Sequence, residues 1–95
     1  MEEFYRPAQN DYLRMLKQGD TVIELFIRPD APARVNNPEA QGLRHLAFRV
    51  EDLEGTVAKL EAMGIPCEPI RWDEFTQKQM TFFRDPDGLP IELHG

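Results

Sequence analysis

The sequence has very few residues that could cross-link it or anchor it in a membrane. Its 95 residues include one cysteine, Cys67, which excludes an internal disulfide. No apolar run approaches the roughly 20 residues that a membrane-spanning helix needs, and the first residues lack the basic and apolar segments of a signal peptide. We therefore expect a cytoplasmic protein with no membrane partner.

Basic side chains and histidines are also scarce. The 17 Asp and Glu outnumber the 11 Lys and Arg, and the net charge of −6 argues against nucleic acid as a partner. Only two histidines occur, His45 and His94, which is too few for a zinc finger. A metal site in this chain would therefore have to include carboxylate ligands.

The first part of the chain is predicted to form β-strands only. Three short segments are rich in aromatic and β-branched residues and are separated by turn-forming residues: 3–6, 12–16 and 21–27. Prolines and paired asparagines then exclude regular structure from residue 29 to residue 42.

The second part of the chain is predicted to form a strand, a helix and three further strands. The helix is expected at residues 53–63, because Asp52 is a suitable N-cap and Gly64 a suitable stop. The strands are expected at residues 43–50, 67–72, 79–84 and 89–94.

Together these elements predict an α+β fold in one domain over residues 1–95. Residues 43–95 form a complete βαβββ module, residues 29–42 a linker loop, and residues 1–28 an incomplete βββ module. If the two modules are repeats, the first lacks an opening strand and helix, on the order of 25 residues by typical element lengths.

Two glutamates and a histidine stand out on the predicted strands. Glu24 and Glu92 each lie between an isoleucine and a leucine, and His45 lies on the strand predicted at residues 43–50. A carboxylate on an apolar strand is costly unless it is exposed, paired or bound to metal. Two interpretations stay open: the three side chains converge on a metal ion, or they face solvent on the open side of an antiparallel sheet.

Three segments resemble the glyoxalase I-like branch of the vicinal oxygen chelate superfamily, which also contains bleomycin resistance proteins and dioxygenases. They are VIELF at residues 22–26, GLRHLAF at residues 42–48 and TFFRDPDGLPIEL at residues 81–93. The chain is most similar to small bacterial lactoylglutathione lyase-like proteins. The resemblance implies βαβββ modules whose mixed, mostly antiparallel sheets curl around a divalent metal.

The resemblance implies that Glu24, His45 and Glu92 are the metal ligands. Nickel or zinc is the expected ion, with cobalt, manganese and iron as alternatives. The family's fourth ligand, a His or Gln, lies on an opening strand that has no counterpart in this sequence. We therefore expect weak or absent glyoxalase activity from this chain alone. His94 is a lesser candidate for the fourth position.

The activity implied by the resemblance is that of a carbon–sulfur lyase or isomerase. A small α-oxo compound, or its adduct with glutathione or another thiol, would react through a metal-stabilised enediolate. Glu92 would be the catalytic base and Glu24 its catalytic counterpart. Two alternatives remain open: a metal-free module that sequesters a small drug, and a catalytically silent truncated domain.

The sequence also predicts a homodimer, intertwined through exchanged strands. Ile23, Leu25 and Ile27 share one face of their strand, and the helix that would cover them in a complete module is missing. An uncovered apolar face and an open sheet edge favour pairing with a second copy.

Overall fold

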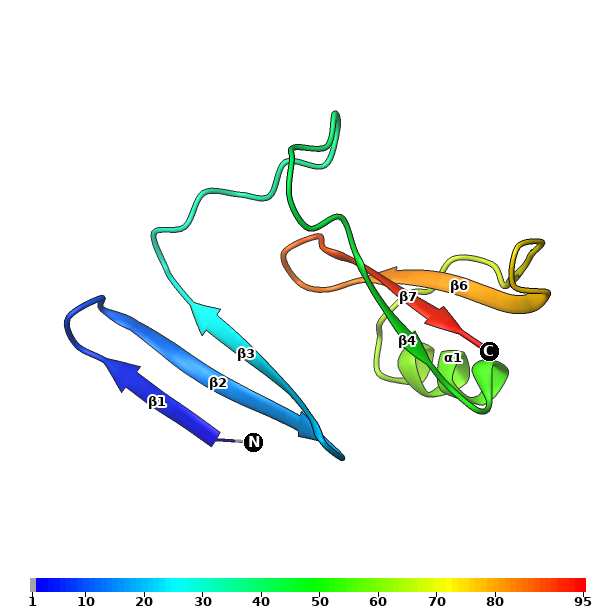
Figure 1. Cartoon of the computed structure of the whole chain (residues 1–95), viewed down its shortest axis with the longest axis horizontal. Helices are drawn as coiled ribbons and strands as arrows, with labels where there is room; N and C mark the ends of the chain where they lie inside the picture. The colour runs from blue at the N-terminus through cyan, green and yellow to red at the C-terminus, as the bar shows by residue number, and fades with distance from the viewer. Residues whose placement is uncertain (1) are drawn as a thin grey trace. The chain divides into compact units, whose positions relative to one another are not determined.

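The computed structural model of the protein describes residues 2–95 (Figure 1). The chain divides between Pro32 and Ala33 into two compact units. The elements are β1 (Glu2–Arg6), β2 (Asp11–Gln18), β3 (Thr21–Ile27), β4 (Leu46–Arg49), α1 (Leu53–Ala62), β5 (Arg71–Asp73), β6 (Lys78–Arg84) and β7 (Pro90–His94).

The first unit is an antiparallel sheet with the strand order β1-β2-β3. Its two turns use residues that tolerate a left-handed backbone, Asn10 at φ 52° and Gly19 at φ 59°. The expected meander of three strands is therefore confirmed. β1 and β2 extend one or two residues beyond their predicted bounds, and β3 has the bounds that were predicted.

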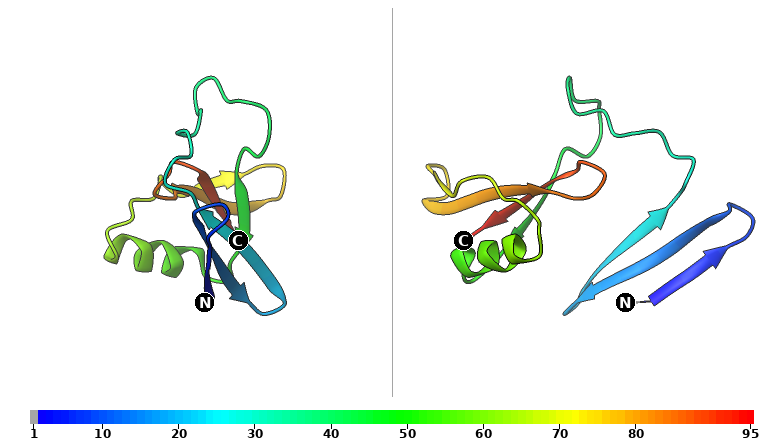
Figure 2. Two further views of the ribbon diagram at one scale, coloured as in Figure 1. Left: turned by 90° about the vertical axis from the view of Figure 1, so that its left-hand side faces the viewer. Right: turned by 180° about the vertical axis from the view of Figure 1, so that it is seen from behind.

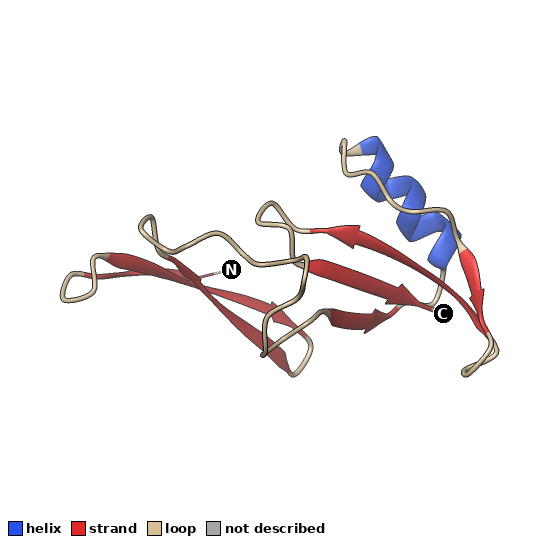
Figure 3. Ribbon diagram, turned by 90° about the horizontal axis from the view of Figure 1, so that it is seen from above, coloured by secondary structure: helices blue, strands red, loops and turns tan. Residues whose placement is uncertain are grey.

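The second unit is a four-stranded sheet with the order β4-β7-β6-β5. β4 and β7 are parallel, and the other neighbours are antiparallel. Helix α1 lies on one side of this sheet (Figures 2 and 3). The buried side chains of this unit are Leu53 on α1, Thr81 on β6, and Ile91 and Leu93 on β7. The predicted α+β class and the βαβββ order of this unit are confirmed.

Local signals place both ends of α1 as the sequence predicted. The Asp52 carboxylate accepts a hydrogen bond of 3.0 Å from the Gly55 N–H, which is one of the unpaired donors at a helix start. Gly64 follows the last turn at φ 82°, a conformation that glycine adopts without strain.

The structure corrects the expected start of the strand at residue 43, because β4 begins at Leu46. The Arg34 guanidinium donates hydrogen bonds to the carbonyls of Leu43 and Arg44, at 3.0 Å and 2.8 Å. These carbonyls thus have a side-chain partner in place of a neighbouring strand. His45 therefore lies directly before β4 and not within a strand.

The strand expected from residue 67 is also corrected, since β5 begins at Arg71. The Glu68 N–H does donate to the Phe82 carbonyl at 2.9 Å. The Glu68 carbonyl, however, accepts from the buried hydroxyl of Thr81 at 2.6 Å. The Thr81 hydroxyl thus bonds to the Glu68 carbonyl in place of a backbone N–H from the neighbouring strand. Regular strand pairing therefore begins only at Arg71, three residues later.

No helix in the described part of the chain is long and apolar enough to cross a membrane.

Candidate functional site

One face of the four-stranded sheet brings together two of the three ligands that the sequence analysis expected, His45 and Glu92. Glu92 on β7 pairs with Ala47 on β4 and with Phe82 on β6, so these three side chains point to the same face. His45 lies directly before β4, and its imidazole reaches Glu92 on this face. The opposite face carries the buried Ile91 and Leu93.

His45 and Glu92 lie close enough to act together. The His45 Nε2 atom is 3.3 Å from the Glu92 Oε1 atom, and both side chains are largely shielded from solvent. The Phe82 ring meets the imidazole edge-on, with the ring centroids 5.3 Å apart. The phenyl ring thus limits the orientations that the imidazole can take.

The short segment before β4 is held by Arg34. Besides the two carbonyls that it binds, the guanidinium donates to the Asn36 side-chain oxygen at 2.8 Å. Because the second carbonyl belongs to the residue before His45, Arg34 fixes the backbone from which the imidazole projects.

The segment before β7 is shaped by a tight turn. One carboxylate oxygen of Asp85 accepts hydrogen bonds from the Asp87 and Leu89 N–H groups, at 2.9 Å and 2.8 Å. Gly88 completes the turn at φ 89°. In this chain the Asp-Pro-Asp-Gly motif therefore orients β7, and with it Glu92.

A cavity of about 180 Å³ opens beside His45 and Phe82. Its lining residues come from the linker, the segments before β4 and β5, and strands β5 to β7: Glu39, Arg44, His45, Glu68, Arg71, Phe82, Arg84 and Pro90. The sequence analysis did not identify Arg71 or Arg84 as lining residues. The side-chain direction of Arg71 follows from its pairing with Met80, which only the sheet register reveals.

Two of the cavity's arginines are already paired with carboxylates. Arg71 lies over the Phe82 ring, with the guanidinium carbon 5.5 Å from the centroid, and its Nη1 atom is 3.1 Å from a Glu68 oxygen. The Arg44 Nε atom is 3.2 Å from a Glu39 oxygen. The lining therefore combines fixed positive charge with an aromatic surface.

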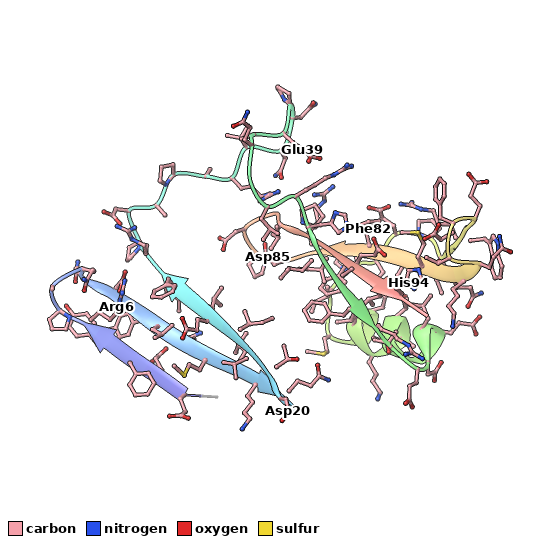
Figure 4. All side chains as sticks on the ribbon, viewed as in Figure 1. Arg6, Asp20, Glu39, Phe82, Asp85 and His94 are labelled. Carbon is pink, nitrogen blue, oxygen red and sulfur yellow. The ribbon has the colours of Figure 1, made fainter. Side chains whose placement is uncertain are left out.

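His94 points along the same face as Glu92 and is engaged elsewhere (Figure 4). Its Nε2 atom is 2.7 Å from the Thr76 hydroxyl and 3.4 Å from an Asp73 oxygen. The Asp73 carboxylate accepts hydrogen bonds from the Phe75 N–H, which has the largest effect, and from the side chains of Thr76 and His94. These hydrogen bonds lower the pKa of Asp73 from its usual value. His94 thus belongs to a polar cluster at the β5–β6 turn.

Glu24 lies on β3 in the first unit, opposite Met15 of β2, and is exposed. Within residues 2–95, no three His, Cys, Asp or Glu side chains are grouped so as to hold a metal ion. The second unit supplies the pair of His45 and Glu92. The role of Glu24 as a third ligand stays a prediction.

Comparison with known proteins identifies the family. The model of the Glyoxalase/Bleomycin resistance protein/Dioxygenase superfamily matches residues 3–93. The uncharacterized protein YaeR of Escherichia coli is 53% identical over 93 residues, which are 97% of this chain and 72% of YaeR. The uncharacterized protein YwkD of Bacillus subtilis is 50% identical over 95 residues, which are 99% of this chain and 74% of YwkD.

Solved structures agree with this assignment. A glyoxalase family protein from Enterococcus faecalis superposes with a TM-score of 0.94 at 54% identity, covering 100% of this chain and 75% of that protein. The trypanothione-dependent glyoxalase I of Leishmania major gives a TM-score of 0.69 at 26% identity, covering 99% and 66%. The chain therefore belongs to the Glyoxalase/Bleomycin resistance protein/Dioxygenase superfamily.

Proposed function

We propose that the protein is a metal-dependent lyase or isomerase of the glyoxalase type, acting on a small α-oxo substrate or its thiol adduct. The observation that carries the proposal is the 3.3 Å approach of the His45 Nε2 atom to the Glu92 Oε1 atom. These two residues lie far apart in the sequence, and the parallel pairing of β4 with β7 brings them together on one face.

The donor pair fits a divalent ion. Ligand nitrogen and oxygen atoms lie about 2.0–2.2 Å from zinc and similar ions. Two such ligands at roughly right angles are about 3 Å apart, close to the separation of His45 and Glu92. Imidazole nitrogen together with carboxylate oxygen suits nickel, zinc, cobalt, manganese or ferrous iron.

Each residue has a defined task in this proposal. His45 and Glu92, with Glu24 as the proposed third ligand, would hold the ion, which when bound would supply Lewis-acid stabilisation to negative charge on two vicinal substrate oxygens. Glu92 takes the proton from the substrate carbon and returns it to the neighbouring carbon, and Glu24 is its counterpart. Phe82 excludes water from one side of the imidazole.

The thiol is part of the proposal for the substrate. A thiol adduct of a 2-oxoaldehyde presents the two vicinal oxygens that such an ion would hold. Glyoxalase I of Saccharomyces cerevisiae is 36% identical over 66 residues, 68% of this chain and 20% of that protein. Glutathione or another small thiol is therefore the proposed cosubstrate.

Metal binding tests the proposal directly. Nickel, zinc and cobalt should each be titrated calorimetrically into the wild-type protein and into His45→Gln, Glu92→Gln and Glu24→Gln. We expect each variant to bind at least about tenfold more weakly, because losing even an outer-shell partner of a metal site costs about 10- to 100-fold in affinity. Glu74→Gln is the matched control, because Glu74 is an exposed glutamate in the turn before β6.

The outcomes separate the candidate functions. A wild-type protein that binds none of the three ions would overturn the metal-dependent function and leave the metal-free binding module. Equal losses in Glu74→Gln and Glu92→Gln would show that the effect is not local. Turnover of the hemithioacetal of methylglyoxal and glutathione by the loaded protein, absent in Glu92→Gln, would identify the reaction.

We also propose that the protein works as a homodimer, with strands exchanged between subunits. The proposal is supported by apolar side chains on the three-stranded sheet that remain exposed: Phe4, Tyr5, Tyr12, Leu16, Val22, Leu25 and Phe26. The strand register puts Tyr5, Tyr12, Leu16 and Leu25 on one face of this sheet. Exposed apolar side chains that gather on one face are typical of an interaction surface.

A further inference from the structure

We propose that the cavity beside His45 selects a substrate that carries an oxyanion next to its oxo group, and that Arg71 is the residue that recognises it. This inference rests on the proposed function and specifies its substrate as a 2-oxoaldehyde, or the thiol adduct of one, that also carries a carboxylate or phosphonate beside the oxo group. It starts from the lining of the cavity, in which three arginines surround His45 and Phe82.

The charge of this cavity differs from that of the rest of the molecule. The whole chain carries a net charge of −6, whereas the lining has three arginines and two glutamates. Arg84 contacts the Gly88 carbonyl at 3.3 Å, and no carboxylate pairs with it within residues 2–95. A local excess of positive charge in an acidic protein attracts anions to this cavity.

Arg71 is the arginine best prepared to bind an anion. The Phe82 ring supports its guanidinium at 5.5 Å, and this ring also contacts the His45 imidazole. An anion held by Arg71 would therefore lie near the group that holds the ion. The planar guanidinium can donate two parallel hydrogen bonds to a carboxylate or a phosphonate.

The present partner of Arg71 does not prevent this exchange. The Glu68 oxygen is 3.1 Å from Nη1, and both side chains are substantially exposed. Exposed ion pairs contribute little to stability. Glu68 therefore holds the guanidinium in place and competes with the substrate for it, so that neutralising Glu68 should strengthen anion binding.

The volume of the cavity favours a compact ligand. It measures about 180 Å³, whereas sites for drug-sized ligands have about 300–1,000 Å³. A three-carbon oxo acid fits this space with its oxyanion at Arg71. Pyruvate, acetylphosphonate and methyl pyruvate are suitable probes, because they share one skeleton and differ in the charged group.

Binding of the three probes should be followed by amide chemical shifts in the chain of residues 1–95, both metal-free and loaded with zinc. We expect pyruvate or acetylphosphonate to bind at least about tenfold more tightly than methyl pyruvate. The tighter of the two anions decides between a carboxylate and a phosphonate substrate. Equal affinity for the neutral ester would overturn the inference.

Variants then assign the preference to Arg71. We expect Arg71→Gln to reduce anion affinity about tenfold and leave the methyl ester unchanged, and Glu68→Gln to increase anion affinity. Arg49→Gln is the matched control, because it removes the same charge from β4, at the opposite edge of the same sheet and outside the cavity lining. If the ion pair between Arg71 and Glu68 only stabilised the local structure, both Arg71→Gln and Glu68→Gln would reduce anion affinity. That result would contradict the inference.

The zinc titration keeps this inference separate from the proposed function. If Arg71→Gln binds zinc normally and loses the anion preference, both proposals are supported. If no variant changes the preference while His45→Gln loses zinc, the substrate inference alone fails. If the wild type binds no zinc and still binds pyruvate through Arg71, the proposed function fails and the anion site remains.

Discussion

At the scale of single residues, Asp11 is the clearest case of a charge whose surroundings fix its behaviour. Its side chain has no exposed surface, and Arg6 binds both carboxylate oxygens at 2.7 Å. The hydrogen bonds from Arg6, with the nearby charge of Arg28, lower the pKa of Asp11 below its usual value. The pair also packs on Phe26, 4.5 Å from the Arg6 guanidinium carbon.

The lowered pKa predicts how stability depends on pH. A carboxylate with a depressed pKa stabilises the fold above its unfolded pKa of roughly 3.9, and this contribution is lost as the pH falls further toward the folded value. We therefore expect the urea midpoint of the wild type to fall below about pH 4. Asp11→Asn should be less stable near neutral pH and should show a flatter acid dependence.

Asp20→Asn provides the control for this pH profile. Asp20 is an exposed aspartate in the turn between β2 and β3, so its replacement should leave the profile unchanged. An acid dependence that is equal in the wild type and in Asp11→Asn would show that other carboxylates cause it.

Arg34 offers a second prediction at this scale, because it binds the two carbonyls that precede His45. Arg34→Lys keeps the charge but loses the planar guanidinium that bonds both carbonyls at once. Because the backbone before His45 would then be held less firmly, we expect zinc binding to weaken about tenfold. The urea midpoint should change little. Calorimetry and urea unfolding measure the two quantities, and Arg49→Lys serves as the control. A large loss of stability with unchanged zinc affinity would assign Arg34 a purely structural role.

At the scale of elements, the start of α1 predicts a coupling between two residues. Asp52→Ala removes the cap and should cost about 1 kcal/mol in the free energy of unfolding. A Cβ atom on Gly55 would lie 2.2 Å from an Asp52 oxygen, so Gly55→Ala must displace the cap. Its gain in helix propensity, about 1 kcal/mol, should offset that loss and leave stability nearly unchanged.

The double variant tests this explanation. With the Asp52 carboxylate removed, Gly55→Ala should show its full propensity gain, so Asp52→Ala with Gly55→Ala should be about 1 kcal/mol more stable than Asp52→Ala alone. Urea unfolding of the four proteins completes the cycle. Strictly additive effects would mean that the new methyl group does not disturb the cap.

The elements also show which features a sequence can predict. The Asp52 cap and the Gly64 stop depend on neighbours a few residues away, and both were predicted. The start of β4 after His45, later than predicted, depends on the Arg34 guanidinium from the linker, and the direction of Arg71 depends on the β5–β6 register. These are contacts between distant segments, which propensity and spacing do not encode.

At the scale of the whole molecule, the exposed apolar side chains of the first unit predict association. We expect light scattering to give a mass near twice the 11.0 kDa of one chain. Leu25 is 43% exposed on the central part of β3, so Leu25→Lys should shift the protein toward the monomer. Leu43→Lys is the control, because Leu43 is an exposed leucine in the second unit. A stable monomer at micromolar concentration would contradict the prediction.

The position of β7 within its sheet has a consequence for the order of events during synthesis. β7 lies between β4 and β6, yet both of these strands precede it in the chain. A ribosome makes β4, α1, β5 and β6 before any residue exists to join β4 to β6. A nascent chain that ends before Pro90 therefore has no candidate site, because it contains His45 but not yet Glu92. Because β4 pairs with β7, the first strand of the second unit with its last, the sheet face that carries His45 and Glu92 forms only after β7 has been made.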